Sequence, residues 1–268
     1  MKLSASLIKT YKMCRRKYEL RYIEEVVPIE AFQSLQDGKN YHKMLEEFYN
    51  GENDLQYCDG RDAKICAMAM AYFEHIYKKH KELQNVKYAE KWFEFPLNEK
   101  HSIVGKNDAV TESNIPVEHK TTSNDINDEY ICALQWDEQI LTYMLTNDIN
   151  EMFYTVVKKP TIRQKQNETD EEFYNRCVEW YKTDTENKAK MIKVTRSKEE
   201  IEEHRKNLIK IADEIEDCNN FYRNPTACNC YNRRCEYSPI CLHYNPQLEY
   251  VEFKKEKRYM EENKNDLF

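Results

Sequence analysis

Two neighbouring stretches of the sequence decide the fold: Val104-Gly-Lys-Asn-Asp108 and Pro116-Val-Glu-His-Lys-Thr-Thr122. We predict that both are β-strands. The short run between them, Glu112-Ser-Asn114, predicts a three-residue turn, in which Asn114 suits the left-handed backbone conformation. The two stretches are therefore expected to form an antiparallel hairpin.

The register of this hairpin decides which side chains meet. If Thr111 pairs with Ile115 across the turn, Asp108 lies directly opposite Glu118. Successive side chains of a strand alternate between its two faces, so Lys120 points to the same side as Glu118. Two carboxylates and one ammonium group would then share a face where a single divalent cation could meet all three.

Such a face has the groups that phosphodiester hydrolysis requires. Mg²⁺ or Mn²⁺ held by carboxylates can activate a water molecule, polarise the phosphorus and stabilise the leaving oxygen. We predict Asp108 and Glu118 as metal ligands, with the backbone carbonyl of His119 as a further ligand. Lys120 would orient the attacking water and offset developing negative charge. Spacing alone leaves one alternative open, a hairpin whose charged face is merely solvated.

Composition sets broad limits on the class of protein. The chain has 268 residues, of which 33% are charged and only 4 are glycine, which is typical of a helix-rich protein with few flexible linkers. Its net charge of −7 would ordinarily argue against a nucleic-acid partner. That argument is weak for an enzyme that gathers carboxylates around a metal, and Cys14-Arg-Arg-Lys17 is a local basic patch. No apolar run is long enough for a membrane span, so we expect an intracellular, cytoplasmic protein without a membrane partner.

The rest of the chain is predicted to combine many helices with a few strands. Apolar residues at three- and four-residue spacing predict helices over about residues 4–27, 31–50, 61–84, 129–146, 169–182 and 198–222. Strands are predicted over about 87–97, 102–111, 115–121, 151–159 and 190–195. The segment 224–243 is dense in Cys, Pro and Asn and lacks periodicity, which indicates a site and not a packing element.

Ten cysteines in an intracellular protein indicate metal binding or buried thiols more than a disulfide framework. Three of them have the spacing Cys228-x6-Cys235-x5-Cys241, with Cys230 interposed, and Cys14 lies more than 200 residues earlier. Cys14 also falls on an apolar helical face, where it could belong to the core. Zinc is a further alternative, although Cys-x2-Cys pairs are absent. The remaining five lack partner spacing and are predicted to be ordinary buried thiols: Cys58, Cys66, Cys132, Cys177 and Cys218.

Several segments together resemble one known family. They are, in chain order, Ser4 to Tyr18, Gly38-x-x-x-His42, Gly105-x-x-Asp108, Glu118-x-Lys120 and Gln139-x-x-x-Tyr143, followed by the C-terminal cysteines. In this order they resemble the RecB-like branch of the PD-(D/E)XK nucleases, which includes iron-sulfur exonucleases of phage and CRISPR-adaptation systems. The motifs cover most of the chain, so they are much more specific jointly than any one of them is alone.

The resemblance implies roles for individual residues. His42 matches the family histidine that ligates the metal, and imidazole suits Mn²⁺ in particular. Gln139 and Tyr143, at positions i and i+4 of one helical face, match a motif that positions DNA or the catalytic lysine. Three residues already singled out match the metal-binding and catalytic signature: Asp108, Glu118 and Lys120.

The resemblance also implies a 4Fe-4S cluster. The iron-sulfur members of the family bind it through one N-terminal and three C-terminal cysteines. The matching positions in this chain are Cys14, Cys228, Cys235 and Cys241, and the spacing to Cys235 favours Cys228 over Cys230. Such a cluster would close a loop of more than 200 residues and act as a staple for the fold.

The expected fold is α/β, with a restriction-endonuclease-like core in which helices flank a mixed central sheet. We expect a single nuclease domain with a helical part over 1–86, a catalytic core over 87–160, a helical part over 161–223, a cysteine cluster over 224–245 and a charged tail over 246–268. The expected function is a metal-dependent DNA exonuclease, using Mg²⁺ or Mn²⁺ and acting on DNA ends or single strands, with a helicase or recombination protein as a further partner. Two alternatives stay open, a non-catalytic DNA-binding or assembly module of the same fold and a zinc-stabilised endonuclease.

Overall fold

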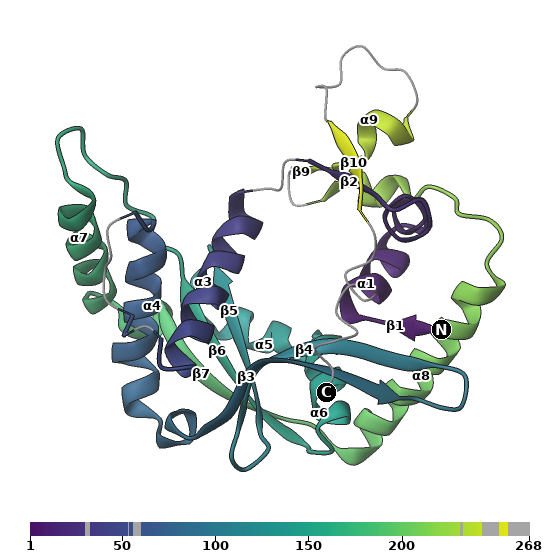
Figure 1. The fold of residues 1–268 in the computed structure, drawn as a ribbon, viewed down its shortest axis with the longest axis horizontal. Coiled ribbons are helices and arrows are strands. Elements are labelled where there is room, and N and C mark those ends of the chain that lie inside the picture. The colour runs from purple at the N-terminus through teal and green to yellow at the C-terminus, as the bar shows by residue number, and fades with distance from the viewer. Residues whose placement is uncertain (30–32, 53, 56–59, 231–232, 243–251, 257–268) are drawn as a thin grey trace. The chain divides into compact units, whose positions relative to one another are not determined.

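The computed structural model describes residues 1–29, 33–52, 54–55, 60–230, 233–242 and 252–256, and it divides into two compact units (Figure 1). The first comprises Met1–Phe32, Trp92–Gly105 and Arg205–Phe268, and the second comprises Gln33–Lys91 and Lys106–His204. Three elements have residues in both units: β3 (Val86–Pro96), β4 (Ser102–Thr111) and α8 (Lys198–Asp217). That the chain is one nuclease domain stays a prediction.

A mixed sheet forms the centre of the second unit. The end of β4 pairs antiparallel with β5 (Pro116–Thr122), β5 pairs parallel with β6 (Glu151–Lys158), and β6 pairs antiparallel with β7 (Ala189–Thr195). All residues of β6 from Met152 to Val157 are buried, as expected for a strand that is covered on both faces. The predicted α/β class, with helices around a central mixed sheet, is confirmed.

The hairpin of β4 and β5 has the register that its sequence predicts. Ala109 pairs with Val117, which places Asp108 directly opposite Glu118. Asn114 in the turn has a φ of 60°, the left-handed conformation expected of it. Local turn chemistry therefore brings the two carboxylates together.

Helices cover both faces of this sheet. On one face, α3 (Gln33–Tyr49), α4 (Ala63–His75) and α7 (Asp170–Lys182) enclose the main hydrophobic core against β5 and β6 (Figure 1). On the other face, α6 (Glu138–Thr146) packs on β6 and hydrogen-bonds to β5. Side-chain caps start α4 at Asp62 and α7 at Thr169, the latter with a complete capping box.

One predicted helix of this unit is two helices. Instead of running from 129 to 146, the chain forms α5 (Asp128–Ala133), a 3₁₀ turn (Leu134–Trp136) and then α6. Asp137 separates them with an extended backbone, and its side chain accepts a 2.9 Å hydrogen bond from the N–H of Gln139. An aspartate that can cap the next helix competes with continuation of the previous one. The helix predicted over 61–84 is also shorter, because α4 ends at His75 and two 3₁₀ turns follow it.

The first unit contains several short β-ladders, among them the pair of β8 and β9, and the segment with the C-terminal cysteines. β1 (Lys2–Leu3) pairs with the beginning of β4, and β2 (Val26–Pro28) pairs with β10 (Phe253–Lys255). The helix predicted to reach residue 222 ends at Asp217, the last residue of α8. Beyond it lie a 3₁₀ turn (Pro225–Ala227), β8 (Asn229–Cys230), β9 (Arg233–Arg234) and α9 (Ser238–Cys241). Among the described residues of both units, no helix has the length and apolar character needed to cross a membrane.

The helix predicted over 4–27 is wrong in its continuity. Ser4 caps α1 (Ala5–Met13), but the backbone is extended at Cys14, and α2 (Arg15–Tyr18) then leads into a π-helical turn (Glu19–Ile23). Long-range partners take up the backbone groups at this break. Asn224 donates a 2.8 Å hydrogen bond to the carbonyl of Met13, and the N–H of Arg16 donates to the carbonyl of Tyr222 at 3.2 Å. The break thus depends on a segment that lies about 200 residues away in sequence.

Candidate active site

The hairpin places two carboxylates side by side in the interior of the second unit. Asp108 is 9% exposed and Glu118 only 2%. Lys120, on the same face of β5, forms an ion pair with Oε1 of Glu118. The other oxygen, Oε2, is buried and has no hydrogen-bond partner among the described residues. A buried carboxylate oxygen in this state is an open position for a cation.

Strand alternation sends the side chain of His119 to the opposite face. Its Nδ1 lies 2.7 Å from the hydroxyl of Thr155, and its ring stacks on Tyr49 with centroids 5.9 Å apart. The same Thr155 hydroxyl donates to the carbonyl of Glu118 at 3.3 Å. The backbone N–H of His119 meanwhile donates to Oδ2 of Asp108 at 2.8 Å. The His119 ring therefore anchors β5 from behind, and the residue borders the site through its backbone.

His42 of α3 and Glu90 of β3 complete the group. Nδ1 of His42 lies 3.5 Å from Oδ1 of Asp108 and 3.3 Å from Oε1 of Glu90. One candidate ligand atom from each of the three residues lies within 4.8 Å of the other two, a spacing that one metal ion can bridge. Glu118 does not belong to this close group, although it stands next to Asp108.

Glu90 is the site residue that sequence reasoning missed. Its φ of 51° is in the left-handed region, which is uncommon for a residue with a side chain and interrupts the regular alternation of β3. Lys106 supports the side chain, with Nζ 2.7 Å from Oε2 of Glu90. A glutamate in a strand carries no motif of its own, so the sequence offers no signal that separates Glu90 from its neighbours.

Burial and mutual proximity shift the pKa values of these groups in different directions. Burial opposes ionisation of Asp108, but the adjacent His42 outweighs it and lowers the pKa of the carboxyl. Burial, followed by the negative charge of Asp108, raises the pKa of Glu118. Burial disfavours the charged form of Lys120, yet the two carboxylates hold its pKa well above the usual range. Burial lowers the pKa of His119 to about 4, so this ring is neutral near pH 7.

These observations fit a bound divalent cation. A metal ion beside Asp108 would relieve the repulsion between the two carboxylates and satisfy the unpaired Oε2 of Glu118. Carboxylate and carbonyl oxygens suit Mg²⁺ and Mn²⁺, and the imidazole of His42 adds affinity for the softer Mn²⁺. The donor set is thus one that could hold a divalent metal ion.

A relay of hydrogen bonds fixes the ammonium group of Lys120. Nζ donates to Oε1 of Gln139 at 3.2 Å, and Nε2 of Gln139 donates to the hydroxyl of Tyr143 at 2.8 Å. The Tyr143 hydroxyl in turn donates to the carbonyl of Lys106 at 3.0 Å. Gln135, which a continuous helix would have placed one turn before Gln139, is exposed on the 3₁₀ turn. The structure therefore brings Gln139 and Tyr143 to the lysine.

Comparison with known families agrees with this geometry. Residues 2–242 match the family model of the PD-(D/E)XK nuclease superfamily. The chain belongs to this superfamily. Members of the superfamily use divalent metals, and the acidic residues described above are placed to bind one. The predicted superfamily is confirmed, whereas the roles assigned to individual residues stay predictions.

Two solved structures resemble this superfamily member at low sequence identity. SSO0001 is 14% identical, with 90% of this chain and 85% of that chain covered and a TM-score of 0.47. A phage-related exonuclease from Haemophilus somnus 129PT is 13% identical, with 81% of this chain and 95% of that chain covered and a TM-score of 0.37. No curated protein matches the sequence significantly.

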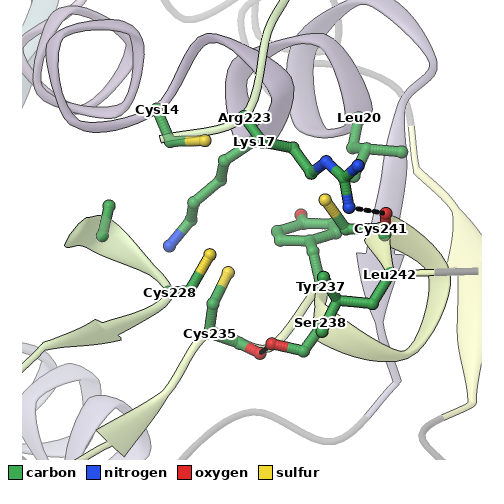
Figure 2. A pocket seen from close by; sticks show the side chains of 11 residues that line it. Cys14, Lys17, Leu20, Arg223, Cys228, Cys235, Tyr237, Ser238, Cys241 and Leu242 are labelled. Atoms are coloured by element: carbon green, nitrogen blue, oxygen red, sulfur yellow. Dashed lines mark hydrogen bonds between the residues drawn. The ribbon is translucent and has the colours of Figure 1, made fainter. Parts of the chain in front are cut away.

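A second candidate site lies in the first unit of this superfamily member. Four cysteines line one pocket there: Cys14, Cys228, Cys235 and Cys241 (Figure 2). Cys230 does not line it. Lys17 and Arg223 also border the pocket, and Figure 2 shows the Lys17 side chain extending between Cys14 and Cys228. The break between α1 and α2 is what turns Cys14 out of the helix.

The spacing of these sulfur atoms bears on what they can bind. Among the described residues, no three of the cysteine sulfurs come within 4.8 Å of one another. Sulfurs around a tetrahedral zinc ion lie about 3.8 Å apart, given a Zn–S bond of about 2.3 Å. The four sulfurs, as placed here, are therefore not gathered as closely as the ligands of one zinc ion. Burial raises the pKa of Cys235 to about 11, so metal or cluster binding there would have to displace a proton.

The other cysteines only partly match their prediction as buried thiols. Cys66 and Cys177 are buried, as expected, whereas Cys218 is half-buried. Cys132 is exposed, because α5 buries none of its residues. Cys58 lies outside the described residues.

Proposed function

We propose that the chain is a divalent-metal-dependent DNA nuclease that hydrolyses phosphodiester bonds from DNA ends or in single strands. The observation that supports this most is the buried pair Asp108 and Glu118 with Lys120 on the same face. Lys120 pairs with only one oxygen of Glu118, and the buried second oxygen, which is unpaired and near the charge of Asp108, is where a further cation would be stabilising. The superfamily membership supplies the reaction class.

In this proposal His42, Asp108, Glu118 and the carbonyl of His119 hold Mg²⁺ or Mn²⁺, with Glu90 as an additional nearby carboxylate. When bound, such an ion lowers the pKa of a coordinated water and neutralises charge on the phosphate. The surrounding residues of the chain hold the proposed metal ligands in place. The His119 N–H fixes one oxygen of Asp108, which leaves the other oxygen near His42 and Glu90.

In this proposal Lys120 orients the attacking water and offsets the negative charge that develops on the phosphate. The two carboxylates keep its ammonium group protonated, so the side chain acts as a hydrogen-bond donor and a cation and not as a base. Gln139 accepts one of its hydrogen bonds, and Tyr143 orients the amide of Gln139. Gln139 and Tyr143 are therefore positioning residues for the lysine.

The preference for DNA ends is a finer part of the proposal. It is supported by the resemblance of the ordered motifs and cysteines to iron-sulfur exonucleases. A helicase or recombination protein that exposes such ends belongs to the same proposal. Linear DNA with a label at either end separates the two possible polarities, and a closed circle of the same single strand separates exonuclease from endonuclease cleavage.

The test uses purified protein with Mn²⁺ on these substrates, both single- and double-stranded. We expect label release from linear DNA, an intact circle and no cleavage in chelator. Lys120→Ala and Glu118→Ala are expected to slow hydrolysis at least about 100-fold. Wild-type protein that degrades none of these substrates, or variants as fast as wild type, would refute the nuclease proposal. Binding without cleavage would favour a non-catalytic DNA-binding module.

The proposed 4Fe-4S cluster is held by Cys14, Cys228, Cys235 and Cys241. Four thiols around one pocket match the soft ligands that such a cluster requires, and Lys17 and Arg223 offset its negative charge. Protein purified without oxygen should absorb near 400 nm and contain iron and sulfide. Serine at any of the four positions should remove this absorbance, and Cys230→Ser, the matched control, should keep it. Colourless protein with stoichiometric zinc would refute the cluster.

A further inference from the structure

Trp136 is an exposed aromatic side chain close to the candidate active site in sequence. Its side chain is 78% exposed, more than any other large hydrophobic side chain in the described part of the protein. Most of the indole surface is therefore open to a ligand. Large aromatic side chains normally bury most of their surface, so the high exposure of Trp136 indicates a role in binding.

The backbone that carries Trp136 is held at both ends. On one side, Leu134 is buried and its carbonyl accepts hydrogen bonds from Arg196, at 2.8 Å, and from the N–H of Asp137, at 3.3 Å. On the other side, Asp137 caps α6 through the N–H of Gln139. The indole is therefore presented outward by a fixed 3₁₀ turn and not by a loose loop. A rigid platform loses little conformational entropy when a ligand settles on it.

The same turn is followed directly by α6, the helix that carries Gln139. Gln139, three residues after Trp136, accepts a hydrogen bond from Lys120. Three residues of chain span at most about 11 Å, so the indole lies within a short reach of the residue that holds the lysine. Tyr130 of α5, the helix that precedes this turn, also reaches the sheet, because its hydroxyl lies 3.4 Å from that of Tyr154, which pairs with Glu118.

We propose that Trp136 is a stacking platform for an unpaired base of the DNA strand that enters the active site. Any base can stack on an indole face, so the contact would favour unpaired nucleotides without reading their sequence. A base inside a duplex is already stacked on both sides and cannot use this face. The inference rests on the proposed nuclease function and deepens it, since it makes single strands or frayed ends the preferred substrate.

The test measures binding without catalysis, in chelator, with a dye-labelled oligonucleotide. Trp136→Ala should weaken binding of single-stranded DNA on the order of 5- to 100-fold, the usual range for loss of one stacked base, and leave blunt duplex binding little changed. Trp136→Phe should restore part of the affinity. Tyr222→Ala removes another exposed aromatic side chain, 55% exposed and in the other unit, and should bind as wild type does.

An abasic nucleotide moved stepwise along the oligonucleotide locates the contact. One abasic position should weaken wild-type binding and have no further effect on Trp136→Ala. The chain has three tryptophans, so a Trp92→Phe, Trp180→Phe background reports Trp136 alone, and single strands should quench its fluorescence. If Trp136→Ala binds single strands within about twofold of wild type, stacking is wrong even where DNA is cleaved. Quenching by single strands, together with no cleavage in Mn²⁺, would instead retain stacking and overturn the nuclease proposal.

Discussion

The main-chain N–H of His119 donates a 2.8 Å hydrogen bond to Oδ2 of Asp108. This bond joins β4 and β5 at the point where both carboxylates face the site. It stabilises Asp108 as an anion, as does the neighbouring His42. Glu118 has the ion pair with Lys120, but its second oxygen is unpaired and it is repelled by Asp108. The folded protein therefore stabilises the charged form of Asp108 but not that of Glu118, so removing each charge should affect the stability of the protein differently.

Asp108→Asn and Glu118→Gln are expected to abolish metal-dependent hydrolysis alike and yet to differ in stability. In chelator, Asp108→Asn weakens the bond from His119 and leaves Glu90 as the carboxylate beside His42, at a cost of about 1–3 kcal/mol in the free energy of unfolding. Glu118→Gln removes a buried anion that Asp108 repels, so stability should be unchanged or higher. Urea denaturation of the metal-free proteins measures both values.

Mn²⁺ supplies the control for these two variants. A ligand that binds only the folded state stabilises it in proportion to its affinity, so Mn²⁺ should raise the unfolding midpoint of wild type. It should raise the midpoint of either variant much less. Equal losses of stability in Asp108→Asn and Glu118→Gln would contradict the inference that the fold stabilises the charged form of Asp108 and not that of Glu118.

The hydroxyl of Thr155 is expected to support the catalytic strand from behind. Thr155→Val leaves Nδ1 of His119 without the hydroxyl beside it and removes one hydrogen bond to the carbonyl of Glu118, which should cost about 1–3 kcal/mol. Because the backbone of β5 then loses an anchor, kcat should fall more than KM changes. Thr155→Ser keeps the hydroxyl and should stay close to wild type in both. A valine variant indistinguishable from the serine variant would show that the hydroxyl has no such role.

Gly105 is expected to be required for packing and not for chemistry. A Cβ at this position would lie 2.7 Å from Cζ of Phe93, closer than carbon atoms can approach. Gly105→Ala should therefore destabilise the protein by about 1–3 kcal/mol. Phe93→Leu in the same chain should recover much of the loss, and a double-mutant cycle measures the coupling between the two positions. Additive effects of the two substitutions would mean that the ring and the new methyl group do not meet.

Thiol reactivity should follow the burial seen in the structure. At pH 8 iodoacetamide is expected to modify Cys132 first, because its side chain is exposed and the reagent can reach the sulfur. Burial raises the pKa of Cys177 to about 11, so this thiol is protonated at pH 8 as well as shielded. Its modification should wait for denaturant. Peptide mass spectrometry over time gives both rates, and comparable rates in native protein would contradict the packing of α7.

Two helix breaks were not predicted from the local periodicity of the sequence. Apolar periodicity continues through Cys14 and through Asp137, so the sequence predicts unbroken helices at both places. At Asp137 the decision is partly local, since an aspartate is a strong N-cap. At Cys14 the break depends on a hydrogen bond that Asn224 donates and on one that the carbonyl of Tyr222 accepts, and no short stretch of sequence contains both the break and these partners. Both breaks have consequences, since one exposes Trp136 and the other turns Cys14 toward the pocket.

By itself, the sequence determined the hairpin and its register. Turn residues and strand alternation act over a few positions, and they suffice to place Asp108 opposite Glu118. Only the tertiary structure decided what surrounds that pair. Glu90 meets His42 across 48 residues through an unusual backbone conformation, and Cys14 shares a pocket with cysteines more than 200 residues away. Contacts of this kind depend on how distant segments pack. Burial at these contacts then changes the pKa values of the side chains, which the local sequence pattern does not predict.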